Sequence, residues 1–405
     1  MQSASTYSGF VSRLFSSRRL LVLGIIFIAA NLRAPISALA PVLDAIIEQF
    51  SLTPTQAGML TTLPLLAFAM GSPLATSLAQ RVGVERSLFI ALLLIGLGLC
   101  SRLVDSSNGL FIGTAVIGIG IAIGNVLLPS VIKRDFPTQL AVMTSTYVLV
   151  MGIVSGGYSA LILPLSLYKN MGWQLALAGF AVITLFSILL WLPQLRRHTP
   201  PPTELAQASG NSKVWRSPLA WQITTLLGFN SFFTYIMYAW MPSILIERGV
   251  LAEQAGVLHG VFQVAAAVAA IALIPILARL KDQRLLSFSL ASLTAVGSLG
   301  LLFAPQLAMF WSVALGFFSG CVFILGLSFI SLRTDTTSQT TSLSGMAQCL
   351  GYLLAASGPM IAGYLQSFFN SWTPVLWLCV AASLICAVAG LFCGRNITIN
   401  EHAAR

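Results

Sequence analysis

Charged residues are scarce in this sequence. Only 8% of its 405 residues are Asp, Glu, Lys or Arg, while 57% are hydrophobic. About 25% of the residues of a soluble globular domain are charged, so the composition excludes a soluble enzyme or binding module. We expect an integral membrane protein that crosses the bilayer many times.

The groups that most catalytic sites need are also few. The chain has 11 acidic residues and three histidines. None of the acidic residues lies at mid-depth in a predicted span, Glu253 being at the outer end of one, and His259 is the only histidine within a span. The six cysteines have no metal-type spacing, and no phosphate-binding glycine loop is present. An enzyme would need a nucleophile–base pair, metal ligands or a buried carboxylate dyad. The sequence therefore predicts no enzyme, no metal and no cofactor.

Long apolar stretches account for most of the chain. A spanning helix needs about 20 residues, and we predict an all-α fold with twelve such helices. No small-residue cleavage site follows the first stretch, so we interpret it as a retained helix. The predicted spans are residues 20–42, 54–78, 87–104, 109–132, 140–165, 173–193, 218–243, 252–277, 286–304, 307–331, 342–367 and 373–394.

Basic residues lie mostly on one side of the predicted spans. With the N-terminus inside, only Arg102, Lys169 and Arg248 of the 21 Lys and Arg residues fall in outer segments, and nearly all the others fall in cytoplasmic segments. This is the positive-inside bias of membrane proteins. It predicts that both termini are cytoplasmic and that the partner of the basic surface is the lipid bilayer, not nucleic acid.

The chain divides into two halves. A polar stretch at residues 196–217, which contains three consecutive prolines, separates an N-terminal six-helix bundle (1–195) from a C-terminal one (218–405). We interpret 196–217 as a cytoplasmic linker.

The two halves also repeat short motifs at nearly one offset. The stretch Gln56–Leu60 returns as Gln254–Leu258, and Asn31 corresponds to Asn230. Parallel six-helix repeats of this kind are typical of transporters that bind solute between the two halves. We therefore predict two six-helix pseudo-repeats.

Several motifs resemble a known family. The loop 78–86 is similar to the signature loop between helices two and three of the major facilitator superfamily, although Gln80 stands where an aspartate is usual. Residues 31–35, which read Asn-Leu-Arg-Ala-Pro, resemble the cyanate permease family of that superfamily. Four further stretches resemble the 2-nitroimidazole transporter branch of this family: residues 60–69, 124–129, 132–137 and 215–222.

The resemblance implies a fold, a location and a mechanism. We expect the major facilitator fold in the bacterial inner membrane, with helices one, four, seven and ten lining a central cavity. Transport would occur by alternating access, and the protein is expected to be a monomer. The substrate would be a small molecule, either a 2-nitroimidazole-like heteroaromatic that is exported or a cyanate-like small anion that is taken up or exchanged.

Arg33 is the strongest candidate for the binding site. It is the only Lys or Arg inside the long apolar run that begins after Arg19. A charge at mid-bilayer costs about 2.5–3.5 kcal/mol on insertion scales, so such residues usually face a bundle interior. With no carboxylate at mid-depth in any span, Arg33 suits an anionic or hydrogen-bond-accepting ligand. A structural arginine, held by backbone carbonyls or asparagine side chains, is the alternative.

Other polar residues lie on single faces of the predicted helices. On the seventh helix, Tyr235 and Tyr238 share a face with Ser231 and Thr234, and Asn230 lies beside them; this pattern favours a planar ligand. Interhelical hydrogen bonding is the alternative for each of these residues. The remaining predicted site residues are Asn31, Asn125, Gln263, Gln348 and Tyr352 for substrate binding and His259 for proton coupling.

A secondary transporter is thus the leading hypothesis. A membrane enzyme lacks the necessary groups, as described above. A passive channel fits less well, because a two-repeat chain with asymmetrically placed polar residues is more typical of a carrier.

Overall fold

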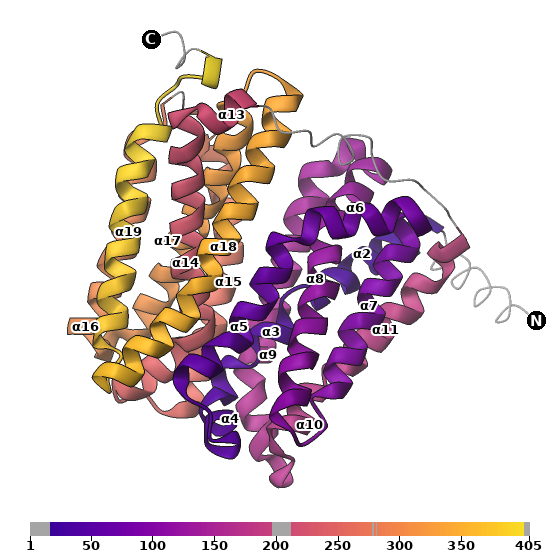
Figure 1. Ribbon diagram of the computed structural model, residues 1–405, viewed down its shortest axis with the longest axis vertical. Coiled ribbons are helices and arrows are strands. Elements are labelled where there is room, and N and C mark those ends of the chain that lie inside the picture. Colours follow the sequence, from indigo (N-terminus) through magenta and orange to yellow (C-terminus); the bar gives the residue numbers. More distant parts are fainter. Residues whose placement is uncertain (1–16, 197–211, 278, 281, 401–405) are drawn as a thin grey trace, which may run out of the picture.

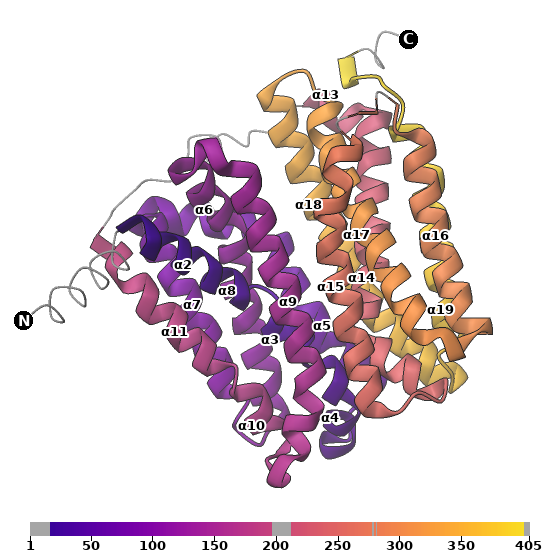
Figure 2. The same ribbon diagram turned by 180° about the vertical axis from the view of Figure 1, so that it is seen from behind.

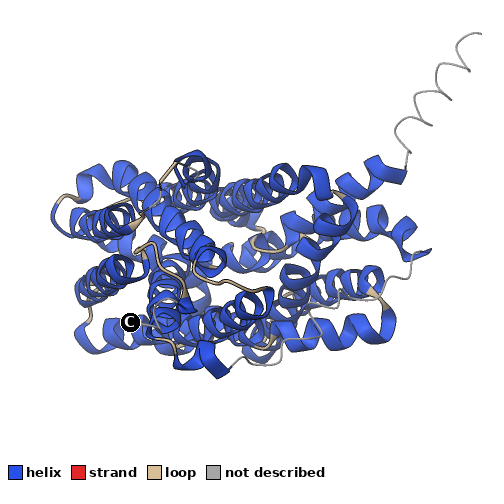
Figure 3. Cartoon of the chain, turned by 90° about the horizontal axis from the view of Figure 1, so that it is seen from above, coloured by secondary structure: helices blue, strands red, loops and turns tan. Residues whose placement is uncertain are grey.

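The fold consists of helices arranged in two bundles. The computed structural model describes residues 17–196, 212–277, 279–280 and 282–400, and these contain helices and no strands (Figures 1 and 3). Helices before residue 197 form one bundle and those after residue 211 form the other (Figure 1). Most of the predicted linker, residues 197–211, lies outside the described residues.

The helices of the first bundle are α2 (Ser17–Asn31), α3 (Ala34–Ser37), η1 (Ala40–Val42), α4 (Leu43–Phe50), α5 (Pro54–Ala69), α6 (Gly71–Val82), α7 (Val84–Ser101), α8 (Ser107–Asp135), η2 (Pro137–Gln139), α9 (Leu140–Leu167), η3 (Tyr168–Asn170), α10 (Gly172–Ala178), α11 (Ala181–Trp191) and η4 (Leu192–Arg196). Those of the second are α13 (Ser212–Arg216), α14 (Pro218–Glu247), α15 (Ala252–Leu277), α16 (Arg284–Phe303), η5 (Pro305–Leu307), α17 (Ala308–Leu332), α18 (Thr337–Phe369) and α19 (Thr373–Cys393).

Each of the twelve predicted spans contains helix, but not all are equally apolar. Within the described residues, nine helices are long and apolar enough to cross a membrane, or ten if the bent pair α5–α6 is one span. Helices α14 and α18 are long enough but are not among them, because polar residues lower their hydropathy. These two helices also carry predicted site residues.

The first span is broken, which differs from the single helix expected over 20–42. Helix α2 ends at Asn31, and the chain then continues as short pieces through α3, η1 and α4. Pro35 and Pro41 explain the breaks, since each lacks the N–H that a continuing helix would donate. The second predicted span bends by 60° between α5 and α6, where Pro73 has the same effect.

The two bundles contact each other mainly at two helix crossings, where α5 packs on α18 and where α9 packs on α15. Glycines allow the close approach at both. A Cβ on Gly58 would lie 2.5 Å from the carbonyl oxygen of Pro359, and one on Gly260 would lie 2.3 Å from that of Gly156. The echoed motifs therefore have the same role in each half: Gly58 and its counterpart Gly256 both pack against the opposite bundle.

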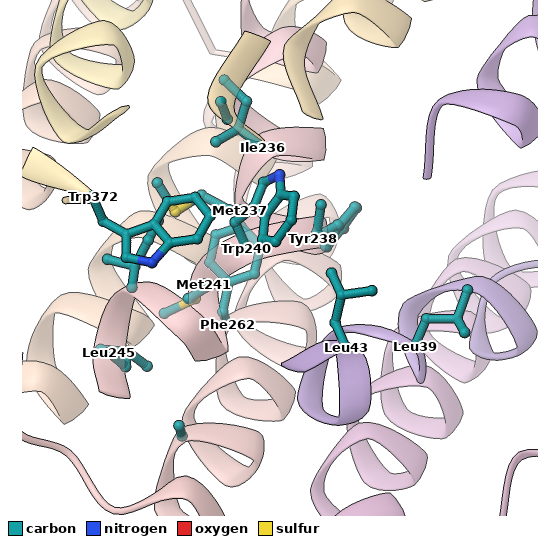
Figure 4. Close-up of a cluster of buried hydrophobic side chains, with 14 of the residues drawn as sticks. Leu39, Leu43, Ile236, Met237, Tyr238, Trp240, Met241, Leu245, Phe262 and Trp372 are labelled. Carbon is teal, nitrogen blue, oxygen red and sulfur yellow. The ribbon is translucent and has the colours of Figure 1, made fainter. Parts of the chain in front are cut away.

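An apolar cluster closes the molecule at the end away from the two termini. It contains residues of both halves, including Leu39 and Leu43 from the first and Met241 and Phe262 from the second (Figure 4). Within this cluster Trp240 packs on Trp372, with ring centres 4.8 Å apart. At the other end the bundles diverge (Figures 1 and 2). In the predicted orientation, the closed end is the outer one.

Candidate functional site

Arg33 lies at the break in the first span. It precedes α3 with a non-helical backbone (φ −144°, ψ −47°), and its carbonyl oxygen accepts from the amides of Ile36 and Ser37. The side chain is partly buried. Among the described residues, no group accepts a hydrogen bond from the guanidinium, and no carboxylate pairs with it. The break therefore presents a cation whose donors are free for a ligand.

Tyrosines from three helices gather around this guanidinium. Its carbon atom lies 5.3 Å from the centre of the Tyr238 ring, a cation–π contact. Tyr147 on α9, Tyr235 on α14 and Tyr352 on α18 are near enough to interact with it electrostatically. Tyr235 and Tyr238 are packed edge to face at 5.5 Å. The predicted trio of Arg33, Tyr235 and Tyr238 is thus brought together, and Tyr352 joins it.

His259 and Gln263 lie behind Tyr238, in the α9–α15 crossing. Nδ1 of His259 is 2.7 Å from the hydroxyl of Ser159, and Oε1 of Gln263 accepts from Ser155. Both side chains are fully buried, and Nε2 of each has no partner among the described residues. His259 approaches Tyr238 at 6.3 Å between ring centres. Tyr238 thus contacts both His259 and the Arg33 guanidinium.

The three predicted asparagines have different surroundings. Asn31 is fully buried; its amide donates to the hydroxyl of Ser187 at 2.7 Å and its oxygen accepts from Thr184 at 2.6 Å. It therefore ties α2 to α11 and is not brought to the tyrosines. Asn230 is buried and Asn125 partly buried, and within the described part of the chain neither side chain has a hydrogen-bond partner.

Helix α18 carries a polar line toward the diverging end of the bundles. Gln348 is exposed and donates to the hydroxyl of Ser344 at 2.8 Å. Tyr352, one turn further along, is partly buried and packs edge to face on Phe68 of α5 at 5.6 Å. The line of Ser344, Gln348 and Tyr352 therefore begins in the open part of the molecule and ends beside Arg33.

Sequence reasoning missed two aromatic residues at this site, Tyr147 and Phe68. Both lie on predicted spans, but neither belongs to a polar face that the sequence analysis identified. The resemblance also directed attention to helices one, four, seven and ten, whereas Tyr147 and Tyr352 lie on the fifth and eleventh. The only available signal was the aromatic side chain itself.

The arrangement suits binding more than bond-breaking chemistry. A free guanidinium can donate two parallel hydrogen bonds to a planar group with acceptor oxygens. Tyrosine faces offer stacking and their hydroxyls offer further hydrogen bonds. Among the described residues, no group of three or more His, Cys, Asp or Glu side chains could hold a metal ion.

Comparison with known families decides the assignment. The family model described as Major Facilitator Superfamily matches residues 21–356. The chain belongs to the Major Facilitator Superfamily. It is a multi-pass membrane transporter, and its fold is that of an alternating-access carrier.

The individual relatives are transporters as well. The chain is 46% identical over 380 residues to the 2-nitroimidazole transporter of Escherichia coli (strain K12), covering 94% of this chain and 96% of the relative. It is 28% identical over 361 residues to Cyanate transport protein CynX of the same organism, covering 87% and 91%. The resemblance to the cyanate permease family and its 2-nitroimidazole transporter branch is thus confirmed.

A solved structure supports the fold independently. The crystal structure of a D-xylose–proton symporter superposes with a TM-score of 0.74 at 14% identity, covering 95% of this chain and 99% of the symporter. At that identity the likeness concerns the fold alone. It confirms the predicted major facilitator architecture, while the exact number of spans stays a prediction.

Proposed function

We propose that this transporter moves a small planar solute with acceptor oxygens, of the 2-nitroimidazole type, outward across the bacterial inner membrane. Arg33 binds the acceptor group, and Tyr238, Tyr235 and Tyr352 hold the ring. The observation that carries the proposal is the Arg33 guanidinium, which has no hydrogen-bond partner among the described residues and is surrounded by tyrosines, three of them from the opposite half. The 46% identity to a protein named for 2-nitroimidazole supports the same substrate class.

A cyanate-like small anion is the second candidate. The same cation favours it, and the chain is also related to a protein named for cyanate transport. With the inside negative, the membrane potential drives a monoanion outward by about 2.3 kcal/mol per 100 mV. Uptake would therefore need a co-transported cation or an exchanged anion. The tyrosines favour the planar heteroaromatic, because a three-atom anion leaves their faces unused.

The other predicted site residues have different roles in this proposal. Asn125 and Asn230 shape the pocket with their unpaired amides, and Gln348 lines the path to it. His259, whose Nε2 has no hydrogen-bond partner in the described part of the chain, carries a proton when the α9–α15 crossing opens. Gln263 helps to orient α9 and α15 relative to each other at the same crossing. Asn31, whose amide is fully engaged with α11, supports the site only through the fold.

The proposal includes the topology. Both termini and the segment 196–217 lie on the cytoplasmic side, and residues 1–195 and 218–405 act as two rigid bundles that rock about the solute. The protein acts as a monomer, because one chain contains both halves of the carrier.

Ligand-induced thermal stabilisation tests the proposal. Purified wild type and Arg33→Ala are compared with 2-nitroimidazole, unsubstituted imidazole, cyanate and benzoate. A charge-assisted hydrogen bond contributes about 1.5–3 kcal/mol, so we expect Arg33→Ala to weaken 2-nitroimidazole binding by about 10- to 100-fold. Arg86→Ala is the matched control, because Arg86 is an exposed arginine at the start of α7.

The pattern across the panel separates the two candidates. Stabilisation by 2-nitroimidazole but not by imidazole supports recognition of the nitro oxygens. Stabilisation by cyanate alone favours the small anion. If Arg33→Ala binds 2-nitroimidazole as the wild type does, the assignment of Arg33 is wrong.

A further inference from the structure

Arg102 is a buried charge that the proposed transport cycle has not used. The sequence placed it in an outer loop, but it follows the last residue of α7 and its side chain is fully buried. Within the described residues, no carboxylate pairs with it, and its Nε has no hydrogen-bond partner. A buried, unpaired guanidinium is costly to a fold, so its contacts need an explanation.

Arg102 contacts the broken segment of the first span, which also carries Arg33. Nη1 donates to the carbonyl oxygen of Pro35 at 2.6 Å, and Nη2 donates to the hydroxyl of Thr114 on α8 at 3.0 Å. In a regular helix the Pro35 carbonyl would accept from the amide of Leu39. Here the Leu39 amide reaches Ile36 instead. Arg102 therefore replaces the hydrogen bond that the break removes.

The opposite side of α3 is held by a second hydrogen bond. The hydroxyl of Ser37 lies 2.5 Å from that of Ser155 on α9 and donates to the Arg33 carbonyl at 3.4 Å. The α3 turn is thus attached to α7 and α8 through Arg102 and to α9 through Ser37. Because α3 has only four residues, its own backbone hydrogen bonds hold it weakly. These side chains fix its direction.

We propose that Arg102 is a positioning residue for Arg33. It acts through the Pro35 carbonyl, which lies two residues beyond Arg33, and holds the turn so that the Arg33 guanidinium faces the tyrosines. A binding group must be held by rigid surroundings to within about 0.5 Å, and a broken helix cannot supply this alone. This inference rests on the proposed function of Arg33 as the ligand-binding cation.

The test compares variants that break the two Arg102 contacts separately. Arg102→Met and Arg102→Gln remove the hydrogen bond to Pro35. Thr114→Val is the matched control, because it removes one acceptor from the same guanidinium and leaves the Pro35 contact. We expect both Arg102 variants to weaken 2-nitroimidazole binding by about tenfold, whereas Thr114→Val keeps wild-type affinity even where its melting temperature falls.

A second readout needs no ligand. The rate at which phenylglyoxal modifies Arg33 is measured by peptide mass spectrometry in the purified full-length protein. We expect a rate change of severalfold in the Arg102 variants and less than twofold in Thr114→Val. If Arg102→Met does not fold, the modification rate of Arg33 is compared between Arg102→Gln and Thr114→Val, since Arg102→Gln retains a polar side chain.

Two results would overturn the inference. One is an unchanged Arg33 modification rate in the Arg102 variants; the other is equal loss of affinity in Thr114→Val, which would indicate general destabilisation. If the wild type binds no member of the ligand panel, the proposed function fails, and the phenylglyoxal rates still decide whether Arg102 positions Arg33.

Discussion

The Arg33 guanidinium and the Tyr238 ring, 5.3 Å apart, meet across the boundary between the two halves. Arg33 belongs to the first bundle and Tyr238 to α14 of the second. Because alternating access requires the halves to move relative to each other, we expect this contact to be made in some states of the cycle and not in others. The candidate site thus forms where the transport movement occurs, and a ligand bound there favours one arrangement of the halves.

The cation–π contact predicts different effects for two substitutions of Tyr238. Tyr238→Phe keeps the aromatic face, and we expect affinity for 2-nitroimidazole within about threefold of wild type. Tyr238→Leu removes about 0.5–2 kcal/mol of cation–π attraction, so affinity should fall by roughly 2- to 30-fold. Isothermal titration of the purified variants measures both. Equal affinities in Phe and Leu variants would show that the ring does not contribute.

The α9–α15 crossing should not tolerate a methyl group at Gly260. In Gly260→Ala the new Cβ would lie 2.3 Å from a backbone oxygen of Gly156. Overpacking costs about 1–3 kcal/mol, which shifts the equilibrium toward the open crossing by roughly 5- to 150-fold. We expect faster thiol labelling of Cys introduced at Ile162, on α9, in a cysteine-free background.

Gly157→Ala is the control for this prediction. Gly157 neighbours Gly156 on the same helix, but a Cβ there would meet no atom within 4 Å. Labelling at residue 162 should therefore remain at the wild-type rate. Equal labelling of both variants would mean that the close glycine contact does not keep the crossing closed.

Asn31 should affect stability and not binding. Its side chain makes hydrogen bonds with Thr184, Ser187 and the carbonyl of Phe27. Asn31→Ala should destabilise the protein by about 1–3 kcal/mol, because buried partners lose their contacts. Thermal melting with and without 2-nitroimidazole checks this. We expect a lower melting temperature than in the wild type but a normal increase on addition of ligand. Loss of that increase would indicate that Asn31 contributes to binding.

His259 is expected to couple transport to protons. In proteoliposomes, His259→Gln should abolish the dependence of solute accumulation on a pH gradient but retain exchange of solute between the two sides. Ser159→Ala is the matched control, since it removes the partner of Nδ1 and leaves the imidazole. Accumulation by His259→Gln at the wild-type level would place the coupling on another group.

The sequence by itself determined the class of fold and the central residues of the candidate site. Scarce charge and long apolar stretches predict a helical membrane protein, because the bilayer interior admits little else. The echo of Gln56–Leu60 in Gln254–Leu258 predicts the two halves. Arg33 is identifiable because an isolated charge in an apolar span is costly, and Tyr235 and Tyr238 because helical periodicity places them on one face.

Only the tertiary structure decided which polar residues meet Arg33. Asn31 is the last residue of α2 and contacts α11, whereas Arg33, two residues later and outside the helix, contacts Tyr238. Tyr147 and Arg102 join the site or support it from distant helices, and no local pattern marks them. Periodicity reports which face of a helix a residue occupies, whereas the partner of that face depends on how helices far apart in sequence pack.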